Sequence, residues 1–97
     1  MTLDTLRDTI SPVARDLGLQ RVIVFGSYAR GEQTECSDID LIIDSGGSFR
    51  GGQLFYAIGK MLKVLPIQAD IFELSEVKKP SETYTNIMRD GVVIYEQ

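Results

Sequence analysis

The sequence predicts an α/β fold in which helices pack on one face of a mixed β-sheet. Three observations predict it. Apolar residues recur at helical spacing in two long segments, short β-branched runs lie between and after them, and glycine or proline separates the segments. The predicted order is helix, strand, strand, helix, strand, helix, strand. Two layers are expected, with the other face of the sheet partly open.

The first helix and the strand after it carry the clearest patterns. Apolar residues recur every three or four positions over 3–17, with Thr2 suited to an N-cap and Gly18 to a stop. Pro12 lies inside this pattern and predicts either a kink or a second turn that begins there. Residues 21–25 are β-branched and aromatic, which predicts a short buried strand.

The remaining elements follow from the same signals. The expected segments are a turn at 26–31, a polar loop at 32–37, a strand at 38–43, a glycine-rich mobile loop at 45–52, a helix at 53–65, a strand at 67–74, a helix at 81–90 and a final strand at 92–95.

Length and composition fit one globular domain over residues 1–97. No apolar run approaches the roughly 20 residues that span a bilayer, and the N-terminus lacks a signal-peptide core. Cys36 is the only cysteine, so no intrachain disulfide forms. These features predict a cytoplasmic protein with no membrane partner.

Charge and the absence of histidine limit the chemistry. Without histidine, Ser-His-Asp catalysis and histidine-ligated zinc are excluded. The net charge of −4 argues against a direct nucleic-acid partner, because phosphate backbones are bound chiefly by clustered Lys and Arg. An acidic chain can still bind ATP when metal ions neutralise both sets of charge. The local basic concentrations are expected to face solvent: Lys60, Lys63, Lys78 and Lys79.

Three aspartates are candidate metal ligands. Asp38 and Asp40 share one face of a predicted strand, about 7 Å apart along the backbone at ~3.3 Å per residue, where like charges repel unless a cation binds. Mg²⁺ uses one or two carboxylates plus phosphate oxygens, and two such ions can hold the attacking and leaving oxygens of a phosphoryl displacement. Asp70, in an otherwise apolar strand, is the candidate third carboxylate.

The Gly26-Ser27 pair is a candidate phosphate site. Glycine lets the backbone approach a ligand closely, and successive amides at a turn or helix start bind anions. The Ser27 hydroxyl can donate to a terminal phosphate. Arg30 can bind phosphate oxygens or a local carboxylate such as Glu32 or Glu35.

Each feature also has a plainer interpretation. The Gly-Ser pair suits an ordinary turn, and Asp-x-Asp suits a solvated strand end. Asp70 can accept hydrogen bonds from loop amides, and Arg30 is equally suited to a structural tether. Tyr28 is expected to pack, and Asp44 to be a solvated turn acid. The combination and spacing of the motifs nevertheless favour a nucleotide and metal site.

The pattern resembles the minimal nucleotidyltransferase (MNT) group of the DNA polymerase β-like nucleotidyltransferase superfamily. The resemblance rests on Gly26-Ser27, ten intervening residues and Asp38-Ile39-Asp40, with further matches over 24–31 and 37–41. It extends over nearly the whole chain and implies a small palm-like α/β core.

The resemblance also implies an activity and a partner. Members transfer AMP from ATP to a hydroxyl and release pyrophosphate, and many are antitoxins that bind, and in some cases adenylylate on a tyrosine, a HEPN-domain RNase toxin. Carried over, Asp38 and Asp40 hold two Mg²⁺ ions and Asp70 is the third ligand and activates the acceptor. Gly26 and Ser27 hold the ATP phosphates, with Arg30 as a further phosphate ligand.

Three functions remain open at this point. The first is an AMP-transferring antitoxin that forms a hetero-oligomer with a HEPN toxin, with self-association as a further option. The second is an antitoxin that neutralises its partner by contact alone. The third is nucleotidyl transfer to a small-molecule hydroxyl, which the absence of a substrate-binding domain disfavours.

Overall fold

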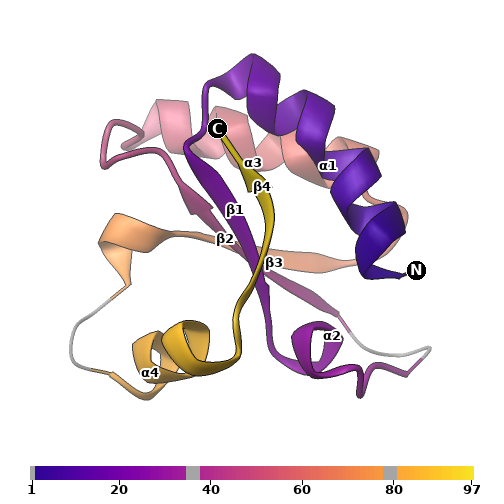
Figure 1. Ribbon diagram of the computed structural model, residues 1–97. Coiled ribbons are helices and arrows are strands. Elements are labelled where there is room, and N and C mark those ends of the chain that lie inside the picture. Colours follow the sequence, from indigo (N-terminus) through magenta and orange to yellow (C-terminus); the bar gives the residue numbers. More distant parts are fainter. Residues whose placement is uncertain (1, 35–37, 78–80) are drawn as a thin grey trace.

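The structure is a computed structural model and describes residues 2–34, 38–77 and 81–97. The predicted elements are present in the predicted order (Figure 1). They are α1 (Leu3–Leu17), β1 (Arg21–Phe25), α2 (Ser27–Arg30), β2 (Ile39–Asp44), α3 (Gly52–Val64), β3 (Ala69–Glu73), the 3₁₀ turn η1 (Leu74–Glu76), α4 (Glu82–Asp90) and β4 (Val92–Glu96). The predicted turn at 26–31 contains one turn of helix, α2. The bounds of α1 and β1 are as predicted, and those of the later elements agree to within two residues.

The caps of α1 form as the sequence predicts. The Thr2 side chain accepts a hydrogen bond from the Thr5 backbone N–H at 3.1 Å, and Gly18 ends the helix in the left-handed conformation at φ 72°. The helix continues through Pro12 as one element. The alternative of a second turn starting at Pro12 is therefore not adopted.

The sheet is mixed, with strand order β3-β2-β1-β4. β1 runs antiparallel to both β2 and β4, whereas β2 and β3 are parallel. A parallel pair needs a long crossover, and α3 supplies it between β2 and β3. The predicted fold class is confirmed.

The main core lies between one face of the sheet and the helices α1 and α3, which lie together on that side (Figure 1). Alternate strand residues point into this core, as a period of two requires. The fully buried side chains include Leu6, Ile10, Val22, Val24, Leu41, Ile43 and Met61. Because side chains alternate along a strand, the residues between these buried positions face the opposite side of the sheet.

The opposite face carries a smaller cluster in which Ile23 and Ile42 pack with Ile87 of α4. The helix α4 thus covers part of the face that α1 and α3 leave free (Figure 1). Phe72 on the same face is 47% exposed, so the face is partly open as expected. Among the described residues, no helix is long and apolar enough to cross a bilayer.

Candidate active site

The parallel pairing of β2 and β3 brings two of the predicted carboxylates together. Asp40 is the register partner of Asp70, and Phe25 of β1 is the partner of Asp40 on the other side. Ile39, Leu41 and Ile71 point into the main core, so Asp40 and Asp70 project from the open face. Asp38 is exposed and lies just before β2 begins.

The carboxylates act on one another electrostatically. Burial raises the pKa of Asp40 above its usual value, and the negative charges of Asp70 and Asp38 raise it further. The Arg30 guanidinium acts in the opposite direction. A site that disfavours the carboxylate charge in this way favours a bound cation, because the cation removes the repulsion.

The three aspartates do not form a ready-made metal cage. Within the described parts of the chain, no group of three acidic side chains stands close enough together to hold a metal ion. The donor set nevertheless fits Mg²⁺, which takes one or two carboxylates and fills its other positions with water and phosphate oxygens. The adjacent Asp40 and Asp70 supply such a pair.

Gly26 lies directly against this pair. Its backbone has φ 72° and ψ −149°, and a Cβ added there would lie 2.5 Å from Asp40 Oδ2. An ordinary turn would explain the positive φ but not the close contact with a carboxylate. The contact places the backbone of the Gly-Ser turn beside the acidic pair, where a phosphate bound to a metal ion can reach both.

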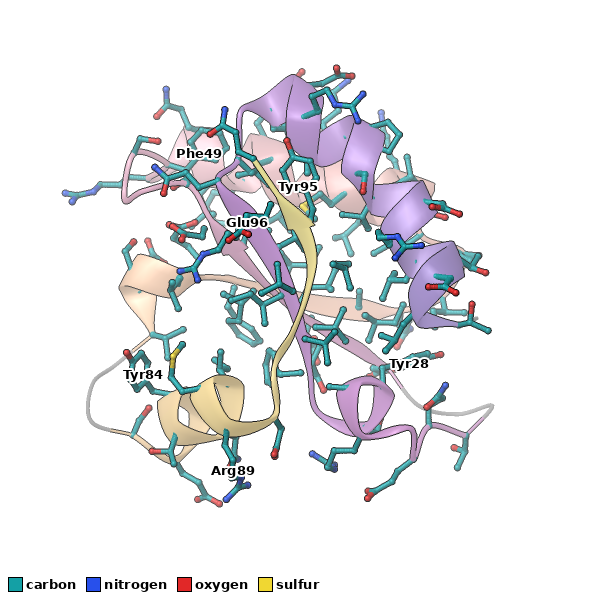
Figure 2. The ribbon with its side chains drawn as sticks, in the orientation of Figure 1. Tyr28, Phe49, Tyr84, Arg89, Tyr95 and Glu96 are labelled. Carbon is teal, nitrogen blue, oxygen red and sulfur yellow. The ribbon has the colours of Figure 1, made fainter. Side chains whose placement is uncertain are left out.

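The short helix α2 keeps Ser27 next to this contact. Its hydrogen bonds run from the Arg30 N–H to the Gly26 carbonyl at 3.2 Å and from the Glu32 N–H to the Ser27 carbonyl at 2.9 Å. Tyr28 is 4% exposed and belongs to the main core; Figure 2 shows it between α2 and the start of α1. Its expected role as a packing aromatic is confirmed.

Arg30 is tethered locally. Its Nε donates to Glu32 Oε2 at 3.1 Å, and both side chains are largely exposed. It also lowers the pKa of Asp90, although the hydrogen bond from Arg89 has the larger effect there. An exposed ion pair contributes about 0–1 kcal/mol, so Arg30 can exchange Glu32 for a phosphate at small cost.

The interpretation of Asp44 as a solvated turn acid is wrong. Its side chain is 13% exposed and its Oδ2 lies 2.9 Å from Arg21 Nη2 and 3.0 Å from Arg21 Nε. Its Oδ1 accepts the Gly46 N–H at 2.9 Å. Arg21 starts the antiparallel partner strand opposite Asp44, a pairing that the spacing of one strand cannot reveal.

Two features near the site were not predicted. Glu73 is 1% exposed, and its Oε1 accepts hydrogen bonds from the Ser45 N–H at 3.3 Å and the Ser45 hydroxyl at 2.9 Å. It thereby anchors the start of the 45–52 loop, which was expected to be mobile throughout. Phe72 and Phe25 form a ring contact with centroids 6.5 Å apart beside the carboxylates. Strand alternation from Ala69 was the available signal for Glu73.

Comparison with known proteins agrees with this geometry. The family described as "Polymerase beta, Nucleotidyltransferase" matches residues 8–97. The chain therefore belongs to the polymerase beta nucleotidyltransferase family.

Two curated relatives come from Methanocaldococcus jannaschii. "Putative protein adenylyltransferase MJ0435" is 41% identical over 46 residues, which are 47% of this chain and 50% of that protein. "Putative protein adenylyltransferase MJ0604" is 32% identical over 84 residues, which are 79% of each chain. The chain thus spans half the length of the first relative.

Three solved structures share the fold. One, "Structure of putative minimal nucleotidyltransferase", has a TM-score of 0.74 at 26% identity and covers 95% of each chain. A toxin–antitoxin structure with AMP-PNP has a TM-score of 0.77 at 22% identity over 94% of this chain and 73% of that chain. A structure of a tri-AMPylated Shewanella oneidensis HEPN toxin in complex with an MNT antitoxin has a TM-score of 0.73 at 17% identity. The match covers 99% of this chain and 74% of that chain.

Proposed function

We propose that the chain is a Mg²⁺-dependent nucleotidyltransferase that transfers AMP from ATP to a hydroxyl, and that this hydroxyl is a tyrosine of a HEPN-type toxin for which it acts as the antitoxin. The observation that carries the proposal is the register of Asp40 beside Asp70, with the Gly26 backbone against Asp40. Support for the partner comes from the toxin–antitoxin structures that share the fold.

The residues have separate roles in the proposed reaction. Asp38 and Asp40 hold two metal ions, and Asp70 completes the site. Bound Mg²⁺ supplies neutralising charge and a fixed orientation for the phosphates. Gly26 and Ser27 hold the β- and γ-phosphates, and Arg30 is available as a further phosphate ligand once it leaves Glu32.

In the proposed reaction Asp70, which is exposed on the open face beside Asp40, receives the acceptor hydroxyl. Its carboxylate orients that hydroxyl and takes its proton as the oxygen bonds to the α-phosphorus. The bond from the α-phosphorus to the bridging oxygen breaks, and pyrophosphate leaves. Catalysis then depends on positioning and on charge stabilisation around phosphorus, as in phosphoryl transfer generally.

A contact-only antitoxin is the second candidate. It is favoured by one observation: in the described structure the three aspartates are not gathered into a metal-binding group. In that case the partner is neutralised by binding, and the carboxylates contribute nothing to the neutralisation.

One experiment separates the two. ATP labelled at the α-phosphate is incubated with Mg²⁺, the chain and the protein encoded by the adjacent gene, and transfer of label to that protein is measured. Asp38→Ala/Asp40→Ala should abolish labelling, whereas Asp4→Asn/Asp8→Asn, which removes two exposed carboxylates from α1, should not. A stable complex that is never labelled, yet still suppresses the toxin, would favour contact alone.

A further inference from the structure

The outer face of α3 is an unusual surface for a small acidic protein. We define it by Phe55, Tyr56, Gly59, Lys60, Leu62 and Lys63. Phe55 is 78% exposed, Tyr56 61% and Leu62 42%, although Ala57 and Met61 on the inner side of the same helix are fully buried. Contiguous exposed apolar groups of this kind mark contact sites more often than chance positions do.

Gly59 has no internal role in the described structure. It lies in the middle of α3 without a positive φ, and a Cβ placed there would meet nothing within 4 Å. Glycine at such a position costs about 1 kcal/mol relative to alanine. On the helical wheel it separates the Phe55–Leu62 side from the Tyr56–Lys63 side. Because glycine adds no side chain between these two sides, a second backbone can come close to α3 at this point.

The two lysines give this face its charge. Lys60 and Lys63 lie one turn apart, and neither is within ion-pair distance of a carboxylate among the described residues, whereas four arginines are paired: Arg7, Arg21, Arg30 and Arg89. Lys60 Nζ lies 5.5 Å from the centre of the Tyr56 ring. On a chain of net charge −4, this face thus combines two exposed aromatic side chains with two lysines that form no ion pair among the described residues.

The charge decides between two occupants. In a twofold contact between copies, residues near the axis meet themselves. An axis at Gly59 would bring the two Lys60 side chains together, which repel. An apolar segment flanked by aspartate or glutamate would instead pair with both lysines while its apolar side covers Phe55 and Leu62.

We propose that the α3 outer face docks a helix of the partner protein that carries an apolar stripe flanked by acidic residues. The inference rests on the proposed function only for the choice of partner. Because α3 covers the face of the sheet opposite Asp40 and Asp70, a partner held there leaves the carboxylates accessible (Figure 1). Docking and chemistry then occupy separate surfaces.

The test measures the affinity of the chain for the protein encoded by the adjacent gene, with the two co-expressed. Gly59→Leu places a bulky side chain at a position where a Cβ meets nothing within 4 Å, and Lys60→Glu/Lys63→Glu reverses the charge. Each should weaken the complex by about tenfold or more, with no loss of folding by circular dichroism. Arg15→Glu, a charge reversal on the exposed side of α1, should leave the affinity within about twofold of wild type.

Every result decides the point. Wild-type affinity in both α3 variants, or no complex with the wild-type chain, overturns the docking assignment. A wild-type homodimer that Gly59→Leu dissociates assigns the face to a second copy and also overturns it. Failure of AMP transfer with docking intact overturns only the proposed function. If the α3 variants lose docking but still bind Mg²⁺ and nucleotide, the docking inference is supported independently of the proposed function.

Discussion

Gly26 is constrained twice, by a φ of 72° and by the Asp40 carboxylate against which its Cα lies. Gly26→Ala should therefore destabilise the chain by about 1–3 kcal/mol, since a non-glycine residue is strained at that φ and its Cβ would displace Asp40. The displacement should also weaken Mg²⁺-dependent nucleotide binding. Urea unfolding and titration with a nucleotide analogue measure the two effects.

Gly52→Ala is the matched control, because that position has no positive φ and a Cβ there meets nothing within 4 Å. It should leave stability unchanged or raise it by up to about 1 kcal/mol. Equal destabilisation by both substitutions would show that Gly26 is not specially constrained.

Asp40 makes the stability of the metal-free chain depend on pH. Burial, Asp70 and Asp38 raise the pKa of Asp40 in the folded state. A carboxyl with a raised folded-state pKa stabilises the fold at low pH, and this contribution is lost as pH rises through that pKa. Asp40→Asn should therefore gain stability relative to wild type as pH rises above about 4.

Urea midpoints measured in EDTA from about pH 3 to about pH 7 would show this trend as a widening gap between the two proteins. If the difference in urea midpoint between the two proteins stayed constant with pH, the pKa of Asp40 would not differ between the folded and unfolded states. Added Mg²⁺ should narrow the gap, because the cation compensates the carboxylate charges.

At the residue scale, the candidate carboxylates could be proposed from the sequence because their motif is local, and the register then places Asp40 beside Asp70. Asp38-x-Asp40 and the Gly-Ser turn lie within fifteen consecutive residues. The pairing of Asp44 with Arg21 was missed because it depends on which strand lies alongside β2 and in which register. Local patterns do not contain that information.

Among the elements, β3 and the loop at 45–49 are joined by one buried carboxylate. Glu73 Oε1 accepts the Ser45 hydroxyl and N–H, and Ser45 Oγ accepts the Phe49 N–H at 3.1 Å. Ser45→Ala removes two of these bonds and leaves Glu73 underpartnered. It should cost about 1–3 kcal/mol, the range for an unsatisfied buried polar group.

The loosened loop should also be cut faster by trypsin after Arg50. Ser48→Ala removes a hydroxyl that donates only to the Ser45 carbonyl, and should have the smaller effect on both readouts. Equal cleavage rates in wild type and Ser45→Ala would show that Glu73 does not hold the loop.

The elements themselves were predictable because periodicity and caps act within a few residues. Thr2, Gly18 and Ser81 lie at the element ends that their chemistry favours. The strand order and the position of α4 were not predictable in detail. Both depend on contacts between distant segments, such as Ile87 of α4 with Ile23 of β1. Gly91 allows that contact, since a Cβ there would lie 2.8 Å from an Ile23 methyl group.

For the molecule as a whole, the net charge of −4 and the acidic open face act together. Excess negative charge destabilises the compact state through self-repulsion. Under the proposed function, bound Mg²⁺ with a nucleotide would reverse this effect at the site where the carboxylates concentrate. A ligand at 100 times its Kd stabilises the folded state by about 2.7 kcal/mol. For a chain of this length, Mg²⁺ with a non-hydrolysable ATP analogue should raise the melting temperature by roughly 10–20 °C.

Three arms of one thermal-shift measurement test this prediction. The analogue without Mg²⁺ should give little shift, because the carboxylates repel its phosphates. Asp38→Asn/Asp40→Asn should melt no lower than wild type without metal, since it removes like charges, yet should lose the Mg²⁺-dependent increase. If Mg²⁺ and the analogue raise the melting temperature of the variant as much as that of wild type, the nucleotide binds elsewhere on the chain. The metal assignment at Asp38 and Asp40 is then wrong.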